Sequence, residues 1–284
     1  MDKVVENNVL IIGGPNAGKT HFGGQLYGRL NNRQFRYKID PQNRPSDLTI
    51  FRDVLDKLAE GKRADHTETS SNRTIELKIY DENNNKIIFA LPDYGGEQIK
   101  SIIEHRRINE IWKEYLEISN SWMLFIRLDE VEPIEDIINR GIPSPEEIQR
   151  RKDDTPPIKV SAAAHFVELV QMFLHVKRVP TFHQVKHPNL TIVLSCWDIL
   201  NLPEKTLPVD ILKQRLPLFY NYLRNTWSED SLSIMGLSST EKTLTDEADE
   251  DYIEKTPINF GYIITPDGEN EKDLTLTIKI LIGK

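Results

Sequence analysis

Short apolar runs alternate with longer amphipathic stretches along this chain. The apolar runs have the length of buried strands and fall at residues 8–12, 74–80, 86–91, 122–128, 190–195 and 232–237. The amphipathic stretches have helical periodicity and fall at residues 19–30, 47–60, 97–118, 160–176 and 209–227, the last with a kink expected near Pro217. This alternation predicts a three-layer α/β fold, in which helices cover both faces of a mostly parallel sheet. The polar turn 81–85 joins two of the runs into a hairpin, which gives the sheet one antiparallel edge strand.

Two stretches interrupt the alternation, and we expect them to be insertions. Residues 141–159 carry prolines among charged residues, whereas residues 238–255 contain the acidic run 246–251. The acidic run has the composition of a solvated or disordered loop, and a docking site for a basic partner is the alternative. Because the chain has no internal repeat, we interpret residues 1–284 as a single domain with these two insertions.

The overall composition narrows the class of protein. Of the 284 residues, 38% are hydrophobic and 28% are charged, which is ordinary for a globular chain with a large core. The net charge of −8 argues against nucleic acid as a direct partner, because proteins that bind it normally carry a basic face. The single cysteine, Cys196, excludes an internal disulfide and fits a reducing compartment. The chain shows neither a signal-peptide pattern nor an apolar stretch of the roughly 20 residues that cross a bilayer, so we expect a soluble cytoplasmic protein with no membrane partner.

The most informative motif follows the first predicted strand. Residues 13–20 read Gly-Gly-Pro-Asn-Ala-Gly-Lys-Thr, which is the G-x-x-x-x-G-K-T pattern between a strand and a helix. In this setting, backbone N–H groups point at phosphates and the helix adds its positive N-terminal end. Lys19 is expected to reach the β- and γ-phosphates, and the Thr20 hydroxyl is expected to ligate Mg²⁺. The predicted nucleotide-binding loop comprises Gly13, Gly14, Pro15, Asn16, Ala17, Gly18, Lys19, Thr20 and His21.

A second phosphate-site element follows the hairpin. Residues 91–97 read Leu-Pro-Asp-Tyr-Gly-Gly-Glu, so an apolar strand ends in the pattern D-x-x-G. Asp93 is placed to hold Mg²⁺ through a water molecule. Gly96 has no side chain to block a γ-phosphate from its backbone N–H group. A simple Gly-rich turn is the alternative interpretation of this element.

Two further elements point to guanine. The strand 190–195 ends in Ser-Cys-Trp-Asp at residues 195–198, where GTP-binding proteins of the Ras-like, translation-factor-like class carry N/T-K-x-D. Asp198 resembles the Asp of that motif, which accepts two hydrogen bonds from guanine, whereas Cys196 replaces the lysine that packs under the base. The small residues after the strand 232–237 resemble the guanine loop of the same class. The residues implied in base binding are Ser195, Cys196, Trp197, Asp198, Ser238 and Ser239. For Asp198, a cap on the following helix is the alternative.

The order of the four elements covers most of the chain and is similar to the translation-factor-related GTPases. In its details it looks most like the prokaryotic double-GTPase group, whose Leu-Pro-Asp-x-x-Gly-Glu and Ser-x-Trp-Asp variants resemble residues 91–97 and 195–198. The resemblance implies a Ras-like P-loop GTPase fold, GTP and GDP as ligands, and Mg²⁺ as cofactor. It also implies work inside bacterial multi-gene conflict systems, including anti-phage defence, with protein partners encoded alongside.

The resemblance also assigns residues to hydrolysis. The class needs a Thr between the first helix and the hairpin, with its hydroxyl on Mg²⁺, and we prefer Thr67 with Thr69 second. Ras-like proteins place a Gln directly after the D-x-x-G glycine to orient the attacking water, whereas here Glu97 holds that position and Gln98 follows. A carboxylate that faces a γ-phosphate is repelled, so we expect slow intrinsic turnover. A partner's arginine is expected to complete the site, with Arg127 as the alternative within this chain.

Two other functions stay open from the sequence. Glu97 favours an interaction module that binds GTP but hydrolyses little or none of it. Arg150 and Arg151, in the Pro-rich insertion, keep open an ATP-using P-loop protein such as a kinase or ATPase, in which Asp198 would have no guanine to bind. Competition between GTP and ATP separates this last class from the other two.

Overall fold

The strands form one sheet with a parallel centre. The computed structural model of the chain describes residues 6–32, 37–40, 49–64, 74–81, 83, 85–92, 96–131, 144 and 161–282. Within these residues the sheet has nine strands in the order β2-β3-β4-β1-β5-β6-β7-β8-β9. Their bounds are β1 (Glu6–Ile12), β2 (Lys38–Ile39), β3 (Ile75–Tyr80), β4 (Lys86–Leu91), β5 (Ser121–Arg127), β6 (Asn189–Ser195), β7 (Leu232–Ser238), β8 (Tyr262–Ile264) and β9 (Asn270–Glu271). Strands β4, β1, β5, β6 and β7 run parallel to one another.

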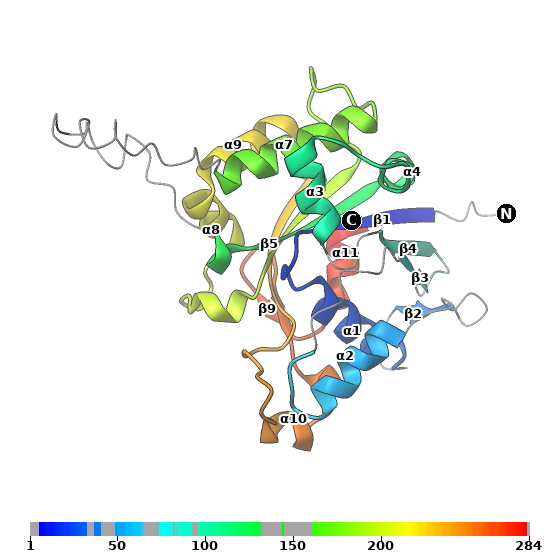
Figure 1. The fold of residues 1–284 in the computed structure, drawn as a ribbon, viewed down its shortest axis with the longest axis vertical. Helices are drawn as coiled ribbons and strands as arrows, with labels where there is room; N and C mark the ends of the chain where they lie inside the picture. Colours follow the sequence, from blue (N-terminus) through cyan, green and yellow to red (C-terminus); the bar gives the residue numbers. More distant parts are fainter. Residues whose placement is uncertain are drawn as a thin grey trace.

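Helices cover both faces of this sheet (Figure 1). The α-helices of the described part of the chain are α1 (Lys19–Leu30), α2 (Thr49–Ala59), α3 (Glu97–His105), α4 (Glu110–Ile118), α7 (Ala162–Val176), α8 (Pro208–Arg215), α9 (Pro217–Thr226), α10 (Glu250–Glu254) and α11 (Leu276–Ile282). Helices α3, α4, α7, α8 and α9 lie on one face, and α1, α2 and α11 lie on the other. No helix within the described ranges is long and apolar enough to cross a membrane.

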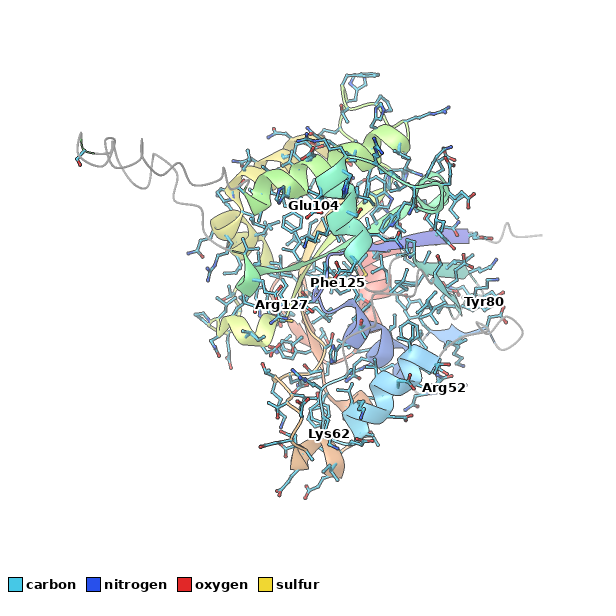
Figure 2. The ribbon with its side chains drawn as sticks, in the orientation of Figure 1. Arg52, Lys62, Tyr80, Glu104, Phe125 and Arg127 are labelled. Carbon is cyan, nitrogen blue, oxygen red and sulfur yellow. The ribbon has the colours of Figure 1, made fainter. Side chains whose placement is uncertain are left out.

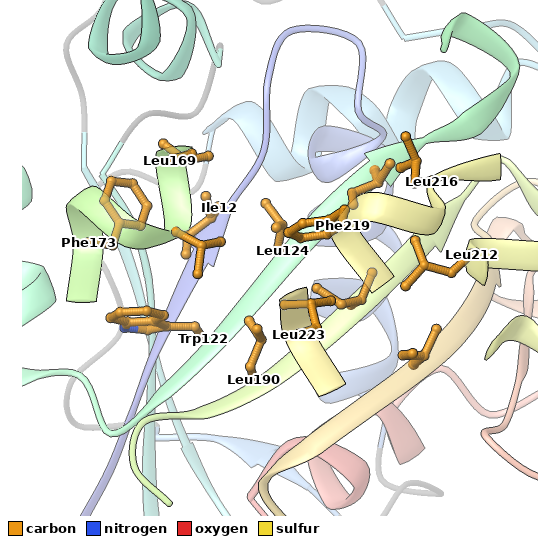
Figure 3. Packing of buried hydrophobic residues seen from close by; sticks show 14 of the residues in the cluster. Ile12, Trp122, Leu124, Leu169, Phe173, Leu190, Leu212, Leu216, Phe219 and Leu223 are labelled. Carbon is orange, nitrogen blue, oxygen red and sulfur yellow. The ribbon is translucent and has the colours of Figure 1, made fainter. Parts of the chain in front are cut away.

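Two apolar cores cover the two faces of the sheet. Every side chain from Ser121 to Ile126 of the central strand β5 is therefore buried. On one face, Trp122 and Leu124 pack with residues of α7 and α9 (Figure 3). On the other face, Met123 and Phe125 pack with residues of α1 and α11. A strand buried on both faces has a nearly continuous apolar sequence, which is why this strand was predictable.

The structure confirms the predicted three-layer α/β fold with a mostly parallel sheet. The prediction of one antiparallel edge strand is wrong, because both edges of the sheet are antiparallel. At one edge β3 pairs antiparallel with β4 and β2 with β3, and at the other β8 pairs antiparallel with β7 and β9 with β8. Strands of two or three residues offer too few positions for an apolar periodicity, so β2, β8 and β9 left no signal in the sequence.

Two stretches predicted as single helices are each divided into two. The stretch 97–118 divides into α3 and α4, because Arg106 ends the first with φ of 51° and the Asn109 side chain caps the second. The stretch 209–227 divides at Pro217, which begins α9, so the expected kink is a complete break. Of the predicted insertion 141–159, all but Ser144 lies outside the described residues.

Parallel strands bring the functional loops to one edge of the sheet. The register pairs Ile12 with Leu124, Arg127 with Ser195, and Ser195 with Leu237. The loops that follow β1, β5, β6 and β7 therefore leave the same carboxyl edge. In open α/β sheets, ligands bind in the crevice outside this edge.

Candidate nucleotide-binding site

A cavity of about 620 Å³ lies at the carboxyl edge of the sheet. Its walls come from the phosphate loop and the start of α1, the ends of β5 and β6, the residues after β7, and the residues after α2. The lining residues are Pro15, Asn16, Ala17, Gly18, Lys19, Thr20, His21, Arg63, Ala64, Glu97, Arg127, Ser195, Cys196, Asp198, Ile199, Ser239, Thr240, Lys242, Thr243 and Leu244. Small-molecule sites of proteins typically have volumes of roughly 300–1,000 Å³, so a nucleotide-sized ligand fits.

The phosphate loop wraps around the ammonium group of Lys19. Lys19 Nζ donates to the carbonyl oxygens of Gly13 (2.6 Å) and Gly14 (2.8 Å), and only 3% of the residue is exposed. Two residues of the loop are left-handed, Asn16 with φ of 57° and Gly18 with φ of 80°. Alternation of left- and right-handed residues turns successive N–H groups inward, which forms an anion-binding concavity. The loop therefore presents backbone donors and one buried cation to the cavity.

Gly96 packs directly on this loop. It is left-handed, with φ of 84°, and a Cβ atom added to it would lie 2.3–2.4 Å from backbone atoms of Gly14 and Pro15. No other L-amino acid fits at this approach. The contact brings the D-x-x-G element to the phosphate end of the cavity, although Asp93 itself lies outside the described residues.

Asp198 also lines this cavity, and the residues at the end of β7 and after it fix its carboxylate. The Ser238 hydroxyl donates to Asp198 Oδ1 (2.5 Å) and accepts the backbone N–H of Glu241 (2.9 Å). Charge-assisted hydrogen bonds of this length are strong and directional. The two elements that the sequence assigned to base binding are thus joined by one side chain.

Cys196 and Arg127 lie next to each other beside Asp198. Burial raises the pKa of the Cys196 thiol to about 11, since desolvation disfavours the thiolate. Figure 2 shows Arg127 at the carboxyl end of the strand that also carries Phe125. The Arg127 guanidinium binds both carboxylate oxygens of Asp129 (3.1 and 3.0 Å) and also pairs with Glu130 (3.2 Å). These pairs hold Arg127 in the cavity wall.

The predicted insertion 238–255, which we name the strap, is anchored to the rest of the protein by buried side chains. Leu244 and Tyr252 of the strap are buried against Val54 and Leu58 of α2. Arg63 pairs with Asp246 (2.7 Å) and Lys242 with Asp249 (2.7 Å), so the acidic run neutralises cations of the cavity wall. The acidic side chains of the run are themselves mostly exposed, as expected of a solvated loop, and the buried anchors Leu244 and Tyr252 flank the run.

Most of the predicted site residues meet in the cavity, but some do not. The residues 15–21, together with Glu97, Ser195, Cys196, Asp198 and Ser239, line it. Gly13, Gly14, Gly96 and Ser238 support it through the contacts given above. Thr67, Thr69 and Asp93 lie outside the described residues.

Two predicted residues point elsewhere. Gln98 Oε1 accepts hydrogen bonds from the Trp112 indole (2.9 Å) and from the Asn109 amide (3.2 Å), so its amide holds α3 against α4. Trp197 is only 6% exposed and packs on β7, where a Cβ atom on Gly236 would lie 2.7 Å from its ring. Neither side chain lines the cavity.

The sequence did not assign several residues that line the cavity. Arg63 and Ala64 come from the stretch after α2, whereas Lys242 and Leu244 come from the strap. The usable signal was the presence of Leu244 and Tyr252 in an otherwise acidic stretch, which is atypical of a solvated loop.

Charged side chains of both signs line the cavity. Its cations are Lys19, Arg63, Arg127 and Lys242, and its carboxylates are Glu97 and Asp198. Carboxylates pair with three of these cations, whereas the Lys19 ammonium donates to neutral carbonyl oxygens of the loop. For Mg²⁺, the Thr20 hydroxyl at the cavity wall is a suitable hard oxygen donor, and an Asp93 carboxylate would complete such a donor set.

The comparisons with known proteins concern the whole chain. The sequence profile of a family described as Double-GTPase 1 matches residues 10–281. The comparison with curated proteins gave no match. Among solved structures, the chain is similar to the GTPase-like domain of S. cerevisiae Ski7 bound to GTP, at 15% identity and a TM-score of 0.41, over 87% of this chain and 46% of that one.

Two further structures are similar over most of both chains. One is the Arl6 BBS3 small GTPase from Trypanosoma brucei with bound GppNp, at 10% identity and a TM-score of 0.40, over 83% of this chain and 88% of that one. The other is the signal recognition particle receptor SRb-GTP/SRX complex from Chaetomium thermophilum, at 12% identity and a TM-score of 0.40, over 86% and 95% of the two chains.

Proposed function

This chain belongs to the double-GTPase 1 family, and from that premise we propose that it is a switch protein that binds GTP and hydrolyses it with Mg²⁺. The observation that carries the proposal is a single cavity lined both by the phosphate loop and by Asp198, whose carboxylate Ser238 holds. A nucleoside triphosphate offers a partner for each, a polyanion and a hydrogen-bonding base.

Each end of the ligand has its own residues. When the nucleotide binds, the Lys19 ammonium gives up its hydrogen bonds to the two loop carbonyls and binds the β- and γ-phosphates instead. The N–H groups of the loop bind the remaining phosphate oxygens. Gly96 offers its N–H group to the γ-phosphate from its position on the loop. Asp198 accepts the N1–H and 2-amino groups of guanine, with Ser238 fixing its carboxylate.

Three residues are proposed to hold Mg²⁺, namely Thr20, Asp93 and Thr67. Their hydroxyl and carboxylate oxygens are the ligands that Mg²⁺ prefers in proteins. When bound, the ion neutralises charge on the phosphates, and these residues orient it.

Intrinsic hydrolysis is proposed to be slow without a partner. Glu97 lines the cavity directly after Gly96, where its carboxylate repels a γ-phosphate, while the Gln98 amide is bonded to Trp112. The same observation favours the second candidate function, an interaction module that binds GTP with little or no hydrolysis. A partner's arginine would raise turnover by ~10³–10⁵, so a stimulated rate separates the two.

The cellular role that we propose follows from the family. We propose the regulatory GTPase of a bacterial multi-gene conflict or anti-phage system, working in the cytoplasm with protein partners encoded alongside it. We propose neither nucleic acid nor membrane as a direct partner, in line with the net charge of −8.

Competition between GTP and ATP for a fluorescent GDP analogue, with Mg²⁺ present, tests the proposed function. Phosphate release is measured on the same protein. We expect GTP to compete far more strongly than ATP and phosphate release to be slow. Equal competition, or stronger competition by ATP, would replace the proposal with the ATP-using alternative.

A further inference from the structure

Tyr252, near the end of the strap, holds the first residues of the strap, which line the cavity. Its hydroxyl donates to the backbone carbonyl of Thr240 (2.5 Å), and Thr240 lines the cavity. Its ring stacks on Phe260 with centroids 3.7 Å apart and an interplanar angle of 8°, and the residue has no exposed surface. A fully buried ring with one hydrogen bond to a site loop fixes the position of that loop.

The stack is in turn anchored to α1, the helix that begins at the phosphate loop. Arg29 Nη2 donates to the carbonyl of Phe260 (2.7 Å), and Gln25 Nε2 donates to the carbonyl of Pro257 (3.0 Å). Both side chains are buried, Arg29 with 1% and Gln25 with 0% exposed. Helix α1 therefore begins at the phosphate loop and also holds, through Arg29 and Gln25, the segment that carries Phe260.

The strap also holds the chain that leads into the predicted first switch. The Asp249 N–H donates to the Gly61 carbonyl, and the Arg63 N–H donates to the Thr245 carbonyl, both at 2.9 Å. Figure 1 shows α10 of the strap beside α2, and Figure 2 shows Lys62 next to it. The preferred switch residue, Thr67, follows Arg63 by four positions in the sequence.

We propose that Tyr252 is a positioning residue for base recognition, which it serves by holding the Thr240 carbonyl in the cavity wall. The inference rests on the proposed function, because it concerns the same ligand. Backbone groups of the loop 238–240 discriminate between bases only if they are held in place, and preorganisation of this kind comes from supporting residues. Tyr252 touches neither base nor phosphate.

The test is Tyr252→Phe, which keeps the ring and removes the hydroxyl. Tyr115→Phe is the matched control, because its hydroxyl also donates a hydrogen bond (to Glu76, 2.9 Å) and Tyr115 is not among the residues that line the cavity. The affinities for GTP and ATP are measured by competition against fluorescent GDP, and the release of that GDP is followed by stopped flow. We expect the GTP-to-ATP affinity ratio to fall about tenfold in Tyr252→Phe with faster GDP release, and to stay unchanged in Tyr115→Phe.

The outcomes separate this inference from the proposed function. A wild-type protein without preference for GTP overturns the proposed function and the inference together. A wild-type preference that Tyr252→Phe retains in full overturns the inference alone. Equal losses of GTP and ATP affinity, or the same loss of preference in Tyr115→Phe, also overturn it, because they report general weakening of the fold.

Discussion

Replacing Gly96 with alanine tests how closely the second phosphate element approaches the loop. The residue has φ of 84°, and the new Cβ atom would lie 2.3 Å from the carbonyl carbon of Gly14. A left-handed alanine costs about 1–2 kcal/mol relative to a right-handed one. Carbon atoms normally pack at about 3.5–4.0 Å, so the two backbones must also separate by more than about 1 Å. Overpacking of this kind costs about 1–3 kcal/mol.

If the contact is kept under strain, we therefore expect Gly96→Ala to lower the free energy of unfolding of the nucleotide-free protein by about 2–5 kcal/mol. If Gly96 instead moves away from the loop, its N–H group can no longer donate to the γ-phosphate, and the affinity for GTP falls more than the affinity for GDP. Urea unfolding and competition binding measure the two quantities. Gly14→Ala is the control for the unfolding energy alone, because a Cβ atom there would have no neighbour within 4 Å among the described residues. The reasoning is refuted if Gly96→Ala leaves both the unfolding energy and the GTP-to-GDP ratio unchanged.

Three further predictions concern single side chains. Lys19→Ala should abolish nucleotide binding while circular dichroism shows the fold intact, and unchanged GTP affinity would end the phosphate-loop assignment. Asp93→Asn should weaken binding with Mg²⁺ more than binding without it, and equal losses in titrations with and without EDTA would make Asp93 structural. Burial raises the pKa of Cys196 to about 11. At pH 8 the folded protein therefore holds a smaller fraction of the reactive thiolate than the unfolded protein does. Labelling of this single cysteine by iodoacetamide at pH 8 should be on the order of 100-fold slower than in urea, should rise toward pH 11, and should slow further with GTP; labelling at the same rate in urea and in buffer would refute the shift.

The central strands and α1 were predictable because their signals are local. Strand β5 is a continuous apolar run, and α1 follows a glycine-rich loop at which the strand pattern stops. The structure begins α1 at Lys19 and ends it at Leu30, as the sequence predicted. The loops after β1, β6 and β7 were predictable as neighbours because parallel strands end at one edge.

The strap was not predictable because its anchors are not local. Arg63 and Asp246 pair across 183 positions of sequence, and Tyr252 is buried by residues of α2 and by Phe260. Each of its acidic residues taken alone favours solvent, so the composition predicts a loop. Only the tertiary contacts show that the run neutralises the cations of the cavity.

The most direct test of guanine recognition is the substitution Asp198→Asn. In the proposed function, the Asp198 carboxylate accepts hydrogen bonds from the N1–H and 2-amino groups of guanine, whereas an asparagine can donate to the 2-oxo group of xanthine. A paired, charge-assisted interaction contributes ~2–4 kcal/mol, or roughly 30- to 1000-fold in affinity. Ser238 donates to Asp198 in the wild type and can donate equally to the asparagine carbonyl, so the loop keeps its support.

The measurement is competition of GTP, XTP and ATP for the wild-type protein and for Asp198→Asn. We expect the wild type to prefer GTP and the variant to prefer XTP. A wild type that prefers ATP, or a variant that keeps its preference for GTP, would contradict the assignment of this cavity to guanine nucleotides.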